Sequence, residues 1–139
     1  GRNSTELMQD NAVIPYHGVL ATNLSHEQRD LLVRLIEEFV YNNREGHARI
    51  RMEEVMAHID ETYFAWDEWD TSLGSEDLFF FRIQSPVIII EFDHQGSIAL
   101  PNAPRHIPIR EHIHTVLRTP NGNDYGKDLL RQHYEQHPH

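Results

Sequence analysis

The chain has 139 residues, of which 39% are hydrophobic and 24% are charged, and its formal net charge at pH 7 is -10. This composition is typical of a folded globular domain rather than a disordered chain. The negative charge would repel a phosphate backbone, so we expect no nucleic-acid partner, and no apolar run is long enough for a membrane span.

The first part of the chain predicts an arm followed by two helices. Residues 1–24 read as an extended N-terminal arm, and residues 25–139 as a single domain. Ser25, with Gln28 three residues later, predicts a capping box at the start of a helix over 26–44. A second helix is expected over 49–61, with Ile50, Val55, Met56 and Ile59 towards the core.

The rest of the chain predicts an antiparallel meander of about four strands and a C-terminal helix that Asp124 caps. Three prolines between residues 96 and 110 predict a long surface loop before the last strand. The expected fold class is therefore α+β. The four expected strands are Thr62–Trp69, Leu78–Gln84, Val87–His94 and His112–Thr119.

Strand alternation predicts one sheet face that carries most of the ionisable groups. Side chains two residues apart on a strand point to the same side. Many ionisable groups that converge on one surface are typical of a small-molecule or metal site. The residues expected on this face are Arg82, Gln84, Glu91, Asp93, His112, His114 and Arg118.

His112 and His114 are the candidate metal ligands, because histidines two apart on a strand can direct both imidazoles at one ion. A third ligand is expected from Asp93 or from His94, which alternation sends to opposite faces, and a bulge could bring either into place. The alternative is a pair of ordinary hydrogen-bonded histidines, since about one such pair is expected by chance in this sequence.

Three further residues are candidates for roles in catalysis. Glu91 could act as a general base or orient a ligand histidine, while Arg118 and Arg82 could hold an anionic group of a small substrate. A cross-strand ion pair without catalytic function is the alternative for Arg82 and Glu91.

The chain contains eleven histidines and no cysteine. This favours a divalent transition metal (zinc, copper or iron) bound by imidazole and carboxylate over any thiolate site. Two glycosylation sequons, at Asn3 and Asn23, favour a secreted or periplasmic location. Because residue 1 is glycine, we expect a processed fragment of a longer protein.

The segments EFDHQ (91–95) and HIHTVLRTPNGNDYGKDLLRQHYEQH (112–137) resemble domain-of-unknown-function family 3500. The similarity extends back through DETYFAWDEW (60–69) and the helix at 26–44. Members of this family are typically longer, so the resemblance implies that the chain corresponds to their C-terminal portion and that a partner chain could complete a site. Glu111 departs from the family motif, which has an amide residue there. The matching positions are Glu91, Asp93, His94, His112, His114, Arg118, Asp124, Gly126 and His133.

These observations support two hypotheses about function. The first is a metal-dependent enzyme, hydrolytic or oxidative, that acts on a small anionic molecule. The alternative is a non-catalytic binding or assembly protein that uses the arm 1–24 and the Pro-rich loop 96–110 for contacts between subunits of a homo-oligomer.

Overall fold

The computed structural model describes residues 13–68, 78–98, 107–120 and 133–137. Residues 69–77, between two of the expected strands, and most of the expected Pro-rich loop lie outside the described residues. So does Asp124, the expected cap of the C-terminal helix, of which residues 133–136 are described as a helical turn. No helix in the described ranges is long and apolar enough to cross a membrane.

The first helix, α1 (His26–Val40), begins at the predicted capping box. The Gln28 backbone N–H donates to Ser25 Oγ (3.2 Å), and the Ser25 backbone N–H donates to Gln28 Oε1 (3.0 Å). Leu32, Ile36 and Val40 are its buried residues, at the four-residue spacing that puts them on one side. The helix is shorter than predicted and ends four residues before residue 44.

The second helix, α2 (Glu45–Ala57), begins four residues earlier than predicted, and a 3-10 turn over Ile59–Glu61 follows it. Ala48, Met52 and Val55 form its buried face, which Ile59 continues. The predicted core face is therefore wrong for Ile50 and Met56, which are 55% and 46% exposed. Both were assigned to the core because they are apolar, but the helical repeat from Ala48 turns them outwards.

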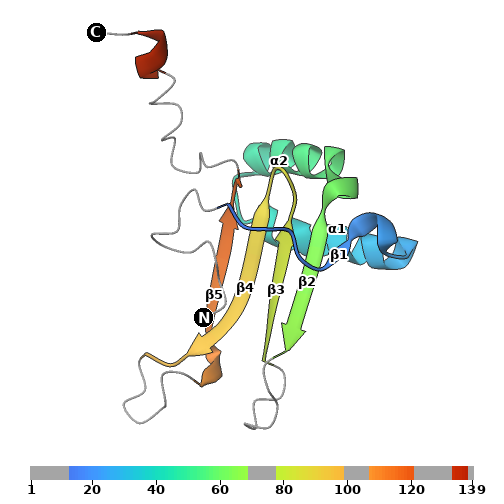
Figure 1. The fold of residues 1–139 in the computed structure, drawn as a ribbon, viewed down its shortest axis with the longest axis vertical. Coiled ribbons are helices and arrows are strands. Elements are labelled where there is room, and N and C mark those ends of the chain that lie inside the picture. Colours follow the sequence, from blue (N-terminus) through green and yellow to red (C-terminus); the bar gives the residue numbers. More distant parts are fainter. Residues whose placement is uncertain (1–12, 69–77, 99–106, 121–132, 138–139) are drawn as a thin grey trace.

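The described strands form one antiparallel sheet in the order β1-β2-β3-β4-β5 (Figure 1). The α+β prediction is confirmed, with five strands instead of about four, because a short strand pairs with the edge of β2. Pro108 opens β5 and does not belong to a loop, a position where a missing N–H is tolerated. The strands are β1 (Val19–Leu20), β2 (Tyr63–Glu68), β3 (Phe79–Gln84), β4 (Ile89–Gly96) and β5 (Pro108–Arg118).

The hydrophobic core lies between the two helices and one face of the sheet, and both helices lie behind the sheet in Figure 1. Phe81, Ile83 and Ile90 from the central strands meet Ile36 and Val40 of α1 there. We call this the helix-side face. The other face of the sheet has no helix from the described residues on it.

The described end of the arm crosses the second face and then pairs with β2. In Figure 1 this segment passes in front of the sheet and leads into β1. Tyr16 packs on Tyr63 with ring centroids 4.9 Å apart, and the Ile14 carbonyl accepts a hydrogen bond from Gln84 Nε2 (2.9 Å). Gly18 has a φ of 93°, a left-handed conformation that turns the chain into β1 and favours glycine.

Candidate functional site

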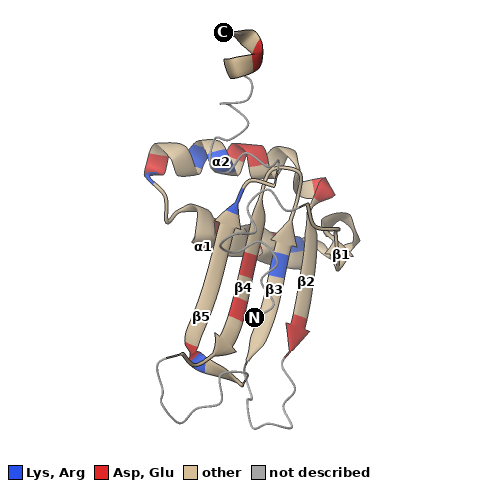
Figure 2. Ribbon diagram, turned by 60° about the vertical axis from the view of Figure 1, so that its left-hand side comes forward, with Lys and Arg blue, Asp and Glu red and all other residues tan. Residues whose placement is uncertain are grey.

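Cross-strand register brings the predicted ionisable residues to the face opposite the helices. Arg82 is paired with Glu91 across β3 and β4, and Asp93 is paired with His114 across β4 and β5. Partners in a register share a face, and so do residues two apart on one strand. We call the group the charged face: Arg82, Gln84, Glu91, Asp93, His112, His114 and Arg118. Figure 2 shows acidic positions of β4 beside a basic position of β3 in the middle of the sheet.

Most of the charged face is buried although no helix of the described residues lies on it, and only His112 and His114 of the group are half-buried. Glu91 and Asp93 are both 0% exposed, while Arg82 and Arg118 are 9% and 8% exposed. Removing a charge from water costs several kcal/mol unless partners compensate for it, so these groups need the contacts they make.

Arg82 and Glu91 form an ion pair at the centre of this face. Both Nε and Nη2 of Arg82 donate to Glu91 Oε1, at 2.8 Å and 2.7 Å. The guanidinium also lies 5.6 Å from the centre of the Phe80 ring. Arg82 and Glu91 thus form the cross-strand ion pair that was the non-catalytic alternative for these residues. The pair also holds two charged groups in place near the histidines.

The imidazoles of His112 and His114 meet edge-on, with their Nε2 atoms 2.9 Å apart. His112 Nδ1 contacts the Gly96 carbonyl oxygen, which can accept but not donate, so this nitrogen carries the hydrogen. In the neutral ring Nε2 then has a lone pair directed at His114. The 2.9 Å contact is a hydrogen bond in which His114 Nε2–H donates to this lone pair, as in the alternative of hydrogen-bonded histidines. A metal ion would have to replace that hydrogen, but one ring nitrogen on a backbone carbonyl is the usual orientation of a metal-ligating histidine.

Asp93 lies next to this pair, directly across the strands from His114. One of its oxygens, Oδ2, accepts a hydrogen bond from Gln95 Nε2 (3.2 Å). Sequence reasoning did not select Gln95 or the Gly96 carbonyl. Their positions depend on a register shift between His94 and Gly96, which alternation along the strand does not predict.

His94 lies on the helix-side face, away from the His112–His114 pair. Its ring packs edge-on against Phe79 and Phe92, at centroid distances of 5.1 Å and 5.3 Å. His94 Nδ1 lies 3.0 Å from the backbone oxygen of Phe79. The register shift falls after His94, which stays paired with Ile113, so the bulge leaves this histidine on the helix side.

The His pair fits a metal ion as two ligands of a larger set. Zinc–nitrogen bonds of 2.0–2.1 Å at a tetrahedral angle put two nitrogens about 3.3 Å apart, close to the observed 2.9 Å. In the described part of the chain, no group of three or more His, Asp or Glu side chains is arranged to hold a metal as it stands. A third ligand from Asp93 would therefore require its side chain to turn towards the histidines.

Arg118 lies at the opposite end of the charged face from the histidines. Arg118 of β5 is paired with Ile89 of β4, and Ile89 is in turn paired with Gln84 of β3. Four residues separate it from His114 along β5, which corresponds to roughly 13 Å. The structure therefore places Arg118 in the region that the arm crosses, and Arg82 nearer the middle of the sheet.

Residues 2–127 match the model of a protein family described as "Protein of unknown function (DUF3500)". The match covers most of the chain, and the place of this segment within longer members stays a prediction. No curated protein and no solved structure matches the chain.

Proposed function

The chain belongs to the DUF3500 family, whose description names no activity, and from its own geometry we propose that it is a metal-dependent enzyme acting on a small anionic molecule. His112 and His114 bind a divalent transition metal through their Nε2 atoms. Asp93 is the third ligand in this proposal, because it shares their face and lies across from His114.

The observation that carries the proposal is the His112–His114 contact. The two Nε2 atoms lie 2.9 Å apart in a hydrogen bond, and one of them belongs to a ring oriented by a backbone carbonyl. An ion that replaced the shared hydrogen would need the two nitrogens to move apart by only about 0.4 Å. Two imidazoles and a carboxylate with open positions suit zinc or iron, and copper also accepts imidazole ligands.

A metal bound there would polarise a substrate oxygen or lower the pKa of a bound water, which supports hydrolysis, or redox chemistry with iron or copper. Gln95 Nε2 donates a hydrogen bond to Asp93 Oδ2, and the Gly96 carbonyl oxygen accepts one from His112 Nδ1. Such contacts orient ligands and are expected to matter nearly as much as the ligands themselves.

The arginines of the charged face support an anionic substrate. Arg82 is oriented by Glu91, which we place in the site as a positioning residue. Arg118 is too far along β5 to contact a small ligand group at the metal, so it would bind the distant end of an elongated substrate.

The test is metal analysis of protein purified without an affinity tag, together with thermal shifts on adding zinc, copper or ferrous iron. An ion at about a hundred times its Kd should stabilise the fold by about 2.7 kcal/mol. The stabilisation should weaken on acidification, because ligation needs unprotonated imidazoles. The double variant His112→Ala/His114→Ala should lose both the bound metal and the shift.

A matched control exists at the C-terminal helical turn. His133 and His137 also stack, with ring centroids 4.8 Å apart, but both are exposed. His133→Ala/His137→Ala should keep the full stoichiometry of metal. Protein without bound metal and without a thermal shift would refute the proposal and leave the binding or assembly protein as the working hypothesis. Equal losses in the two double variants would show non-specific binding to histidines.

A further inference from the structure

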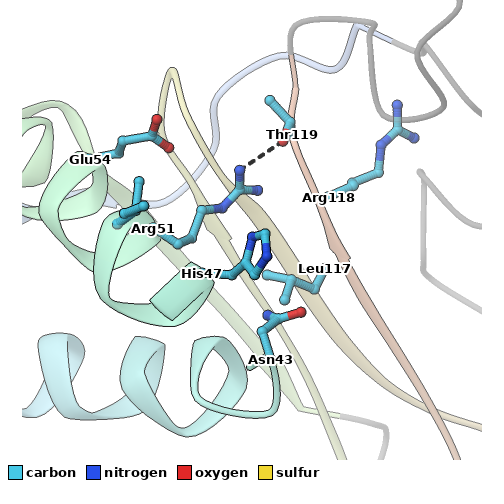
Figure 3. Close-up of a pocket in the computed structure, with 8 residues that line it drawn as sticks. Asn43, His47, Arg51, Glu54, Leu117, Arg118 and Thr119 are labelled. Atoms are coloured by element: carbon cyan, nitrogen blue, oxygen red, sulfur yellow. Dashed lines mark hydrogen bonds between the residues drawn. The ribbon is translucent and has the colours of Figure 1, made fainter. Parts of the chain in front are cut away.

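A second candidate site lies between α2 and the end of β5, on the helix side of the sheet. There a cavity of about 470 Å³ lies between the two elements (Figure 3). Its volume falls in the range of sites for small organic molecules, roughly 300–1,000 Å³. The residues that matter for the argument are Asn43, His47, Ile50, Arg51, Leu117 and Thr119, and we call this cavity the α2–β5 pocket.

The helix contributes one continuous face to this pocket. Ile50 and Arg51 are each three or four residues from both His47 and Glu54, so the four side chains share one face of α2. This face explains why Ile50 is exposed, because it belongs to the wall of the pocket and not to the core. With Leu117 it provides an apolar surface beside the polar groups.

The Arg51 guanidinium is the main charged group directed into the pocket. Its Nη1 donates to Thr119 Oγ1 (2.9 Å), and in Figure 3 it lies beside the His47 ring. Within the described ranges no carboxylate lies within ion-pair distance of this half-buried cation, and Glu54 is separate from it.

Two other lining groups can donate hydrogen bonds to an anion, and Glu54 is the acidic member of the lining. The His47 imidazole and the Thr119 hydroxyl can both donate, and the Arg51 fork matches the two oxygens of a carboxylate or phosphate. Arg118 contributes to the lining, but its side chain points away from Arg51 in Figure 3, so we give it no role.

We propose that the α2–β5 pocket binds a small organic anion, with its carboxylate or phosphate on Arg51 and its apolar part on Ile50 and Leu117. This site is separate from the His112–His114 pair, which lies near the middle of β5 and on the opposite face of the sheet. The inference does not depend on metal binding.

The probes are hexanoate and hexyl phosphate, with hexanol as the uncharged control, titrated into the whole chain by isothermal calorimetry and side-chain NMR. We expect both anions to bind and to shift the His47 ring and Arg51 guanidinium signals, while hexanol binds much more weakly. Tighter binding of one anion identifies the head group. Failure of both anions to shift these signals would overturn the proposal.

The variants separate the role of Arg51 from its contribution to the fold. Arg51→Gln should weaken hexanoate binding by about tenfold or more, as expected for the loss of a charge-assisted hydrogen bond. Arg49→Gln is the matched control, because Arg49 is an exposed arginine of the same helix that does not line the pocket. Equal losses in these two variants would refute a specific site.

A third variant keeps the proposal testable if Arg51→Gln does not fold. Thr119→Val removes the hydroxyl that accepts from Arg51 and leaves the guanidinium in place. Hexanoate should then bind several-fold more weakly, because the hydroxyl orients the Arg51 guanidinium and can itself donate to the anion. An unchanged hexanoate affinity in Thr119→Val, at an unchanged melting temperature, would contradict the assignment of the anion to Arg51 and Thr119.

Discussion

Replacing Glu91 by leucine tests whether burial makes the Arg82–Glu91 pair important for stability. The side chains of Arg82 and Glu91 are 10% and 0% exposed, and two charge-assisted hydrogen bonds join them. At roughly 1.5–3 kcal/mol each, these bonds predict a loss of about 3–6 kcal/mol, because the guanidinium stays buried after its carboxylate is removed. Breaking buried pairs typically costs about 3–5 kcal/mol, which agrees.

The double variant Arg82→Met/Glu91→Leu should recover much of this loss. Apolar residues of similar volume often replace a buried ion pair at little cost, since both desolvation penalties disappear together. The measurement is urea unfolding of the parent, both single variants and the double variant, with the coupling energy taken from the cycle.

The control is the Arg29–Asp60 pair, whose side chains are 33% and 68% exposed. Asp60→Leu should cost no more than about 1 kcal/mol, because solvent screens an exposed pair. If Glu91→Leu and Asp60→Leu destabilise the chain equally, the burial argument is wrong.

Two further predictions concern the arm. Gly18→Ala should release the arm from β2, because a Cβ there would lie 2.6 Å from the backbone carbon of Phe64, and faster amide exchange in β1 would show the release. Gly46→Ala is the control: its Cβ would have open space around it, so this variant should be neutral or more stable by up to about 1 kcal/mol. The pKa of Tyr16 is raised above its ordinary 10.0, first by burial and then by the Glu61 charge, so the folded state favours the neutral phenol. The contribution of Tyr16 to folding stability is therefore complete below pH 10 and is lost as the pH rises through the pKa of the folded state. Amide exchange at residues 14–20 should therefore accelerate at high pH in the parent beyond the intrinsic increase, but not in Tyr16→Phe, and equal acceleration in both would contradict this.

The sequence was most informative where a simple periodicity decides the structure. Alternation along β3, β4 and β5 was enough to predict the charged face. Side chains two residues apart on a strand point to the same face of the sheet, and residues paired across antiparallel strands share that face. The start of α1 was predictable for the same kind of reason, since the capping box of Ser25 and Gln28 is a local pattern.

Tertiary contacts decided what the sequence could not. Whether Asp93 or His94 shares a face with His112 and His114 depended on where the register shift falls, and this is set by the pairing of β4 with β5. The outward position of Ile50 depended on the start of α2, which has no side-chain cap to mark it. Pro108 predicts a loop in isolation, yet the first residue of an edge strand also tolerates it.

The difference between the two faces of the sheet also has a consequence for how the strands align during folding. If β4 paired with β3 one residue out of register, every side chain of β4 would change sides. Glu91 and Asp93 would then lie against Ile36 and Val40 of α1, and Ile90 would leave the core. The two carboxylates therefore penalise the misaligned sheet heavily, so they select the correct pairing whatever ligand the charged face binds.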